Sequence, residues 1–329
     1  MKRIIIRTFG GKSFGYGHYF RCLSLAKAIK SSSGDNDILF LINRDLKELI
    51  VTTGFNYVVS DNLEDDFDVV REYSSSLFIF DSYIGNDKYL KSIKEGTRLM
   101  LIDDNNDIYD SSIPDIIYNG NIHSEDLGYK DIKGQLKLLG TKYLIMKEEY
   151  WNNEGRHIPK DGLLITTGGT DKYGMALRIL EEIKDLDLKK TIIIGPGYED
   201  KYIDELEKVK GRNIELIYRP RSLKEHINSC KIVITAGGST VYEVLSRGSI
   251  PMVFSIADNQ DILCKALEEM GIEYLGKYPH MYFDNLGTRI SRIQNEEISK
   301  YSDIFKLVDG QGAINTARAI ISYIDRRLP

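Results

Sequence analysis

A histidine at the junction of a glycine-rich segment and a helix has the clearest chemical meaning in this sequence. The run Gly15-Tyr16-Gly17-His18 follows a short apolar strand pattern at residues 2–7 and precedes an apolar helical pattern. His18 is therefore expected just beyond the carboxyl end of a strand, where open α/β sheets bind ligands. Imidazole is the most frequent proton-transfer group in enzymes. The sequence favours His18 as a catalytic base, and the alternative is a loop histidine that only caps the helix.

Carboxylates follow two other predicted strands. Asp81 ends the run at 77–81 and is followed by Ser82 and Tyr83, while Asp103 and Asp104 follow the run at 98–102. Neighbouring side chains on an extended strand point to opposite faces, so Asp103 and Asp104 are not expected to form an acid/base couple. One of the three aspartates is expected to support His18, and the sequence leaves open which one. For Asp81 the alternative is a cap of the next helix.

A second glycine turn lies between a strand and a helix in the other half of the chain. Gly237-Gly238-Ser239-Thr240 offers free amides and hydroxyls, which can bind a diphosphate without a metal ion. Glu243, one turn into the helix, is predicted to bind ribose hydroxyls, or else only to complement the helix dipole. The sequence has no GxxxxGK[ST] motif and no GxGxxG after its first strand. P-loop NTPases and dinucleotide-binding enzymes are therefore not favoured.

Two further turns are predicted to contact ligand. Asp258 is a natural N-cap, and Asn259 and Gln260 place amides beside it that suit sugar hydroxyls or a leaving phosphate. Gly168 follows another strand pattern and is predicted to contact the nucleotide, unless this loop simply reverses the chain. The remaining histidines lack metal-ligand spacing and are predicted to lie on the surface: His123, His157, His226 and His280.

Alternating strand and helix patterns position these residues. They predict an α/β fold of two Rossmann-like, doubly wound domains facing a cleft. The domains are expected at 1–147, with the catalytic base, and at 148–310, which would bind the nucleotide; a helix at 311–329 is expected to return to the first domain. The strands are expected at 2–7, 37–42, 56–59, 77–81, 98–102, 115–118, 162–167, 191–194, 213–217, 231–234 and 251–254, and the helices include 18–30, 44–52, 86–95 and 312–324.

Composition narrows the class of protein. The 329 residues carry 44 Lys and Arg against 49 Asp and Glu, without a basic run for nucleic acid. The three cysteines lack CxxC spacing, so neither a disulfide framework nor a metal site is expected. No signal peptide or membrane-spanning run is recognised, and no coiled-coil heptads occur. We expect a cytoplasmic, monomeric protein without a cofactor, a membrane or a nucleic-acid partner.

Taken together, these segments resemble the PseG/SpsG-like family of UDP-sugar hydrolases and their relatives, which share the two-domain glycosyltransferase-B architecture of MurG. The resemblance rests on the segments around His18, Asp81, Asp103, Gly237 and Asp258, which follow one another in the family's order. Many relatives carry Arg-x-Asp after the first strand, where this chain has Arg7-Thr8-Phe9.

The resemblance implies hydrolysis of UDP-2,4-diacetamido-2,4,6-trideoxy-β-L-altropyranose in a pathway of the pseudaminic acid type. His18 would be the base that activates water. The sugar site would include Gly17, Arg21, Asp81, Tyr83, Asn259 and Gln260, and the nucleotide site Gly168, Gly237, Gly238, Ser239, Thr240, Glu243 and Asp258. Two alternatives are kept: a UDP-sugar-dependent glycosyltransferase of surface or spore-coat polysaccharide synthesis, and a non-catalytic nucleotide-sugar sensor.

Overall fold

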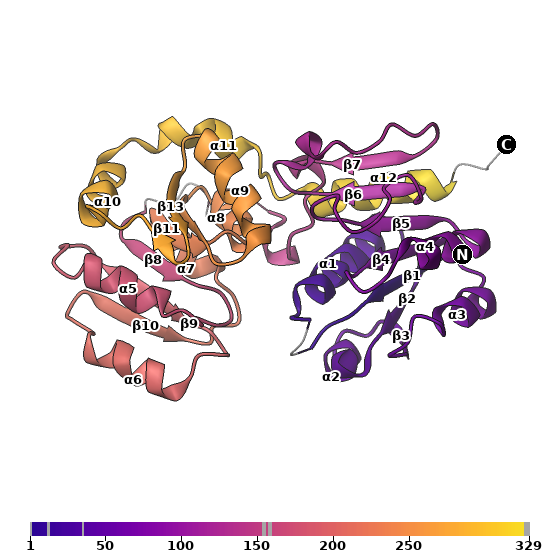
Figure 1. The fold of residues 1–329 in the computed structure, drawn as a ribbon, viewed down its shortest axis with the longest axis horizontal. Coiled ribbons are helices and arrows are strands. Elements are labelled where there is room, and N and C mark those ends of the chain that lie inside the picture. The colour runs from indigo at the N-terminus through magenta and orange to yellow at the C-terminus, as the bar shows by residue number, and fades with distance from the viewer. Residues whose placement is uncertain (1, 12–13, 35, 153–155, 157–159, 326–329) are drawn as a thin grey trace. The chain divides into compact units, whose positions relative to one another are not determined.

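The computed structural model describes residues 2–11, 14–34, 36–152, 156 and 160–325. Contacts divide the chain into two compact units: Met1–Trp151 together with Gly310–Pro329, and Asn152–Asp309. Within the described residues, each unit contains one seven-stranded sheet (Figure 1). The predicted class, two doubly wound α/β domains, is confirmed.

The sheet of the first unit is parallel throughout. Its order is β3-β2-β1-β4-β5-β6-β7, so the direction of winding reverses between β1 and β4. Ligands of open α/β sheets bind at such a reversal, beyond the carboxyl ends of the strands. The strands are β1 (Lys2–Thr8), β2 (Asn36–Ile42), β3 (Asn56–Val59), β4 (Leu77–Asp81), β5 (Leu99–Ile102), β6 (Ile116–Asn119) and β7 (Leu136–Leu139).

Helices cover both faces of this sheet because successive strand residues point to opposite sides. Ile4 and Ile6 of β1 belong to an apolar cluster with α1 and α12, whereas Ile5 belongs to a second cluster with α3 and α4. Burial of both faces explains why the strands read as continuous apolar runs. The helices are α1 (Gly17–Ser32), α2 (Lys47–Val51), α3 (Asp66–Tyr73), α4 (Asp87–Gly96) and α12 (Gly312–Asp325).

The last helix completes the first unit after the chain has passed through the second. Ala313, Ala317 and Ile320 of α12 are fully buried in the cluster that contains α1. In Figure 1 the yellow α12 accordingly lies among the indigo and magenta elements of the first unit.

The second unit repeats this plan with one change. Its order is β10-β9-β8-β11-β12-β13-β14, which reverses between β8 and β11, and only the short β14 is antiparallel. The strands are β8 (Leu163–Thr166), β9 (Lys190–Ile194), β10 (Ile214–Tyr218), β11 (Ile232–Ala236), β12 (Ile250–Ser255), β13 (Glu273–Lys277) and β14 (His280–Met281). The helices are α5 (Met175–Glu182), α6 (Asp200–Lys208), α7 (Lys224–Ser229), α8 (Thr240–Ser246), α9 (Asp258–Glu269), α10 (Leu286–Asn295) and α11 (Ser302–Lys306).

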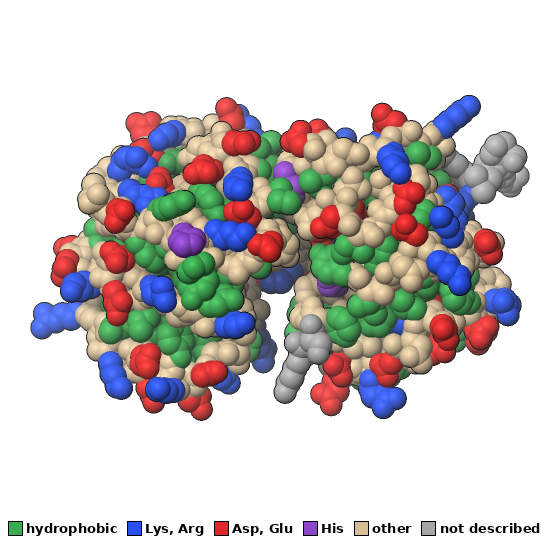
Figure 2. Space-filling model, in the orientation of Figure 1, with side chains coloured by type: hydrophobic (Ala, Val, Ile, Leu, Met, Phe, Trp, Pro, Cys, Tyr) green, Lys and Arg blue, Asp and Glu red, His purple; other side chains and the backbone are tan. Residues whose placement is uncertain are grey.

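Some predicted elements differ in detail. The segment 44–52 begins as a 3-10 turn, Arg44–Leu46, before α2, and the strands β7, β13 and β14 were not predicted. Within the described residues no helix is both long and apolar enough to span a bilayer. On the face drawn in Figure 2, acidic and basic side chains are interspersed rather than gathered into a single basic track.

Candidate functional site

His18 lies at the start of α1 and its ring is held by a buried carboxylate. His18 Nδ1 is 2.6 Å from Asp81 Oδ1, at the end of β4. The two residues come together because β1, which leads into α1, pairs with β4, and Thr8 lies opposite Asp81 in the register. No side chain caps α1, so the alternative role of His18 as a helix cap is wrong.

Asp81 receives three further interactions and is fully buried. Arg21 donates to both of its oxygens, from Nε at 2.9 Å and Nη2 at 2.7 Å, and the Cys22 thiol lies 3.4 Å from Oδ2. Burial alone would raise the pKa of Asp81, but Arg21 and His18 outweigh it and hold that pKa well below its usual range. Asp81 is therefore an ionised acceptor. The alternative of a helix cap is wrong, because Asn86 caps α4.

An ionised Asp81 determines which nitrogen of His18 can act as a base. Arg21 Nη2, a donor, lies 3.2 Å from Nδ1, but the contact of Nδ1 with the ionised Asp81 is shorter, at 2.6 Å. A carboxylate only accepts hydrogen bonds, so the stronger contact places the ring proton of a neutral His18 on Nδ1. Nε2 then has the free lone pair. The His18 side chain is 16% exposed. The arrangement is that of a base oriented by a carboxylate.

Asp104 and Tyr83 extend the cluster. Asp104 accepts hydrogen bonds from Arg21 Nη1 at 2.6 Å and from the Tyr83 hydroxyl. Burial opposes ionisation of Asp104, yet Arg21 lowers its pKa below the ordinary value. The Tyr83 ring meets the His18 ring edge-on, with centroids 4.7 Å apart. Arg21 thus joins the two carboxylates, and Tyr83 packs against the imidazole.

Asp103 does not take part in this cluster. Its carboxylate accepts from the Tyr129 hydroxyl at 2.8 Å and from the amide of Asn106 at 3.0 Å. Burial raises the pKa of Asp103. Of the three candidate aspartates, Asp81 supports His18 directly and Asp104 acts through Arg21.

The loop before α1 is held by its own backbone and by one asparagine. Gly11 and Gly15 exchange backbone hydrogen bonds of 3.0 and 2.8 Å. Asn43, the residue after β2, accepts from the amide of Gly10 at 3.0 Å and donates to its carbonyl at 2.8 Å. Gly17 is the first residue of α1, and a Cβ there would meet only open space. This leaves the start of α1 accessible on the side of Gly17.

In the second unit, two glycine loops lie at the corresponding reversal of its sheet. Gly168 follows β8 and Gly237 follows β11, the two strands between which the winding changes direction. Gly168 adopts a φ of +97°, a conformation that favours glycine. A Cβ on Gly237 would lie 2.4 Å from Cys264 Sγ, whereas one on Gly238 would meet nothing within 4 Å. Gly237 is thus required by packing, and Gly238 leaves space open.

The helix after this loop carries the other residues predicted to contact nucleotide. Ser239 is the residue before α8, Thr240 is its first residue, and Glu243 is buried within its first turn. Asp171, next to the Gly168 loop, accepts from the amides of Met175 and Ala176 at 2.8 Å and so satisfies the first two amides of α5.

The start of α9 differs from its prediction. Ala257, not Asp258, occupies the N-cap position, and the Asp258 carboxylate pairs with Lys277 at 2.6 Å. The N-cap prediction for Asp258 is wrong because α9 already begins at this residue. Gln260 Oε1 accepts from the amide of Ile256 at 3.0 Å, and Asn259 is exposed.

The sequence matches no family model. Over 76% of its length the chain is 26% identical to the uncharacterized protein MJ1062 of Methanocaldococcus jannaschii, of which the match covers 55%. It therefore spans about half the length of that relative. Over 97% of its length it is 23% identical to the spore coat polysaccharide biosynthesis protein SpsG of Bacillus subtilis, covering 98% of it.

Solved structures of low identity share the whole architecture. Acinetobacter baumannii MurG has a TM-score of 0.68 at 11% identity and covers 99% of this chain, with all of its own chain matched. Arabidopsis thaliana UGT89C1 complexed with UDP has a TM-score of 0.69 at 10% identity, with 98% of this chain and 100% of that one matched. The fold is that of the GT-B glycosyltransferases. The glycosyltransferase VinC in complex with DTDP has a TM-score of 0.66 at 13% identity, with 99% of this chain and 100% of that one matched.

Part of the His18 cluster could be predicted from the spacing of residues along α1. Arg21 and Cys22 lie three and four residues after His18, which places all three on one face of α1. The resemblance named Arg21, but no role was predicted for Cys22, whose thiol contacts Asp81. The prediction that the remaining histidines lie on the surface is wrong for His123, which is buried. His226 is partly exposed, His280 is exposed, and His157 lies outside the described residues.

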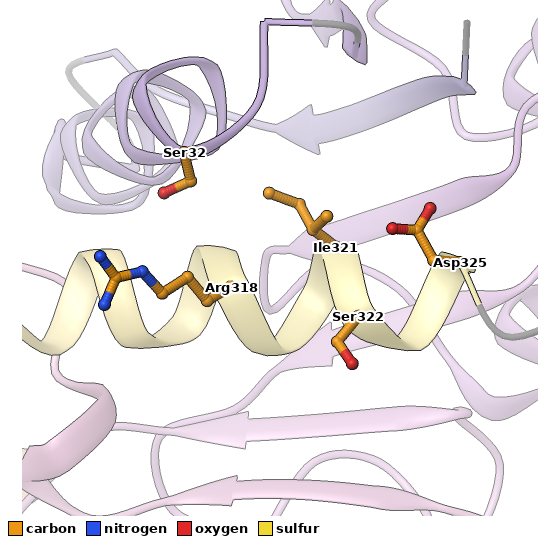
Figure 3. A pocket seen from close by; sticks show the side chains of 5 residues that line it. All are labelled: Ser32, Arg318, Ile321, Ser322 and Asp325. Atoms are coloured by element: carbon orange, nitrogen blue, oxygen red, sulfur yellow. The ribbon is translucent and has the colours of Figure 1, made fainter.

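A surface pocket beside α12 lies far from this cluster. It is lined by Ser32, Arg318, Ile321, Ser322 and Asp325, and Figure 3 shows Ser32 at the last turn of α1, next to α12. Ser32 lies 14 residues after His18 on the same helix, which corresponds to about 21 Å. The pocket therefore belongs to the opposite end of α1 from the histidine.

Proposed function

We propose that this protein transfers a glycosyl group from a nucleotide sugar, with UDP as the expected nucleotide and His18 as the general base. The observation that carries the proposal is the contact between His18 Nδ1 and the ionised, fully buried Asp81. It presents Nε2 as the basic atom at the carboxyl edge of the sheet, beside the reversal between β1 and β4.

In the proposed reaction His18 Nε2 takes the proton of an attacking hydroxyl group. The oxygen of that hydroxyl bonds to the anomeric carbon while the bond from this carbon to the diphosphate oxygen breaks. The electron pair of the broken bond leaves with UDP. Attack opposite the leaving group inverts the anomeric configuration. A positioned general base contributes about 10²–10⁴ to the rate of such a step.

The second unit is proposed to bind the nucleotide. Its glycine loops follow the two strands at which its sheet reverses, and Gly238 leaves space in which a diphosphate can approach the backbone. Glu243 is the proposed partner of the ribose hydroxyls, and Asn259 and Gln260 that of the sugar. The GT-B structures with bound UDP and DTDP support a nucleotide of this kind.

Polysaccharide synthesis is the proposed setting of the transfer. It is supported by the match to the spore coat polysaccharide biosynthesis protein SpsG along nearly the whole chain. The acceptor would then be a hydroxyl group of a saccharide or of a carrier that bears one.

Hydrolysis is the second candidate and uses the same atoms, with water in place of the acceptor hydroxyl. It is favoured by the Gly15-Tyr16-Gly17-His18 segment, which resembles that of UDP-sugar hydrolases. The substrate would be a UDP-linked diacetamido-trideoxy sugar.

Release of UDP from a panel of UDP-linked sugars, with and without saccharide acceptors, tests the proposal. Transfer predicts release that depends on the acceptor and a product of inverted configuration in the NMR spectrum. Release at the same rate without an acceptor would replace transfer by hydrolysis. Binding of UDP-sugars without turnover between about pH 5 and 9 would contradict both reactions and favour a sensor.

A further inference from the structure

A buried histidine with an unpaired ring lies in the loop after β6. His123 is 7% exposed, and within the described residues neither Nδ1 nor Nε2 has a hydrogen-bond partner. Buried polar side chains are rarely left unpaired in folded proteins, and an unpaired one calls for a physical explanation. Both ring nitrogens of His123 therefore have unused hydrogen-bonding capacity.

The loop that carries His123 is fixed to the loop that carries Asp104. Asn119 Nδ2 donates to the Asp104 carbonyl at 2.9 Å, and Asn106 Nδ2 donates to the Leu127 carbonyl at 2.9 Å. His123 lies between Asn119 and Leu127, the two ends of this attached segment. His123 follows β6 and so lies at the same carboxyl edge of the sheet as His18, and Asp104 is close enough to act on the pKa of its ring.

The surroundings of the ring keep it neutral. Burial lowers the pKa of His123, and the nearby Asp104 and Asp126, which act in the opposite direction, do not offset it. A neutral imidazole offers one donor and one acceptor. A sugar hydroxyl or an acylamino group carries the same pair of functions and can satisfy both. Because the ring is screened from solvent, water competes poorly for these hydrogen bonds.

We propose that His123 binds a hydroxyl or acylamino substituent of the transferred sugar and thereby helps to select the sugar. The inference rests on the proposed function, because it assumes that a nucleotide sugar reaches the His18 cluster. It adds a residue that acts on the sugar rather than on the nucleotide. His123 has no part in the proton transfer to His18.

The test compares His123→Phe and His123→Asn with wild-type protein. Affinities for UDP, UDP-glucose and UDP-N-acetylglucosamine are measured by calorimetry, together with UDP release. The Phe variant should weaken the binding of at least one UDP-sugar roughly 10–100-fold, with unchanged UDP affinity, because a site built for a hydrogen bond loses its partner. The Asn variant, which keeps a donor and an acceptor, should recover part of the loss.

Tyr19→Phe is the matched control. The Tyr19 hydroxyl is also buried without a partner among the described residues, but its ring belongs to the apolar core beneath α1. Removal of either unpaired polar group should leave the melting temperature unchanged or raise it. Only the His123 variant should change the discrimination between UDP and UDP-sugar.

Three other results would overturn the inference. Wild-type turnover with unchanged UDP-sugar affinity in His123→Phe would refute it and leave the proposed function intact. Equal losses in His123→Phe and Tyr19→Phe would identify a general effect of core repacking. Absence of any UDP-sugar binding by wild-type protein would reject the proposed function, and the role of His123 with it.

Discussion

Replacement of Asp81 by Asn tests the proposed base most directly. The substitution keeps the shape of the side chain but removes its charge. Asp81 is fully buried and contacts His18 Nδ1 at 2.6 Å and Arg21 Nη2 at 2.7 Å through the same oxygen. The neutral amide holds the proton on Nδ1 less strongly than the carboxylate does, and where its NH2 group faces Nδ1 it acts as a donor and stabilises the tautomer with the proton on Nε2. His18 then has no lone pair at the atom that should accept a proton.

The expected loss of activity follows from this change of tautomer. A general base contributes about 10²–10⁴ in rate, and we expect Asp81→Asn to lower kcat by about 10³. Stability should fall less than for a typical broken buried ion pair, which costs about 3–5 kcal/mol. Arg21 keeps Asp104 as a second carboxylate at 2.6 Å, so we expect a loss of about 2 kcal/mol.

Three measurements separate these effects. Steady-state kinetics gives kcat, denaturant unfolding gives the free energy of unfolding, and ¹⁵N NMR of the imidazole identifies the protonated nitrogen. Asp103→Asn is the matched control. Asp103 follows β5, the strand next to β4, and is also buried, but it binds Tyr129 instead of His18. The reasoning is refuted if folded Asp81→Asn protein retains kcat within tenfold of wild type, or if its ring proton stays on Nδ1.

Three further predictions address the base, the nucleotide loop and a buried ion pair. His18→Ala should reduce turnover about 10²–10⁴-fold with UDP affinity unchanged, and calorimetry together with UDP-release kinetics checks both; near-normal turnover would reject the base. Gly237→Ala should destabilise the second unit by about 1–3 kcal/mol, because its Cβ would lie 2.4 Å from Cys264 Sγ. Gly238→Ala should instead keep the stability and weaken UDP binding, since a Cβ there meets nothing within 4 Å. Both variants are compared by thermal unfolding and UDP titration, and unchanged UDP affinity in Gly238→Ala would remove this loop from the proposed nucleotide site. Burial raises the pKa of Asp66 to about 6 despite its 2.9 Å pairing with Arg7. Between about pH 4 and 6, the folded protein therefore holds a proton on Asp66 that the unfolded protein has released. The contribution of Asp66 to the free energy of unfolding falls as the pH rises through that range. Urea unfolding of wild type and Asp66→Asn at pH 4.5 and 7 should show the advantage of wild type shrinking at the higher pH, and an advantage that grows would contradict the sign.

The fold was predictable because both faces of each sheet are covered. Buried parallel strands read as apolar runs, and those at 77–81 and 98–102 were placed nearly as the structure has them. β7 was missed because its four residues include Lys137, and β14 because it has only two residues. A two-residue strand carries no pattern of its own.

The candidate site was predictable in its parts rather than in its connections. Spacing places His18 and Arg21 on one face of α1, but the pairing with Asp81 depends on β4 lying beside β1 rather than elsewhere in the sheet. That neighbour is set by tertiary packing. The errors have the same origin: the sequence does not show that Asp258 lies within α9 and pairs with Lys277, or that His123 is buried.

The return of α12 makes the first unit discontinuous in the chain. During synthesis, the surface of α1 that α12 covers stays open until residues 312–325 have followed the whole second unit. Lys2 Nζ lies 2.9 Å from the Ile324 carbonyl, so the start of β1 and the end of α12 are neighbours. A circularly permuted gene that begins at Gly310 and joins α12 to β1 through a short linker would encode the histidine-bearing unit as one uninterrupted segment, ending at Trp151.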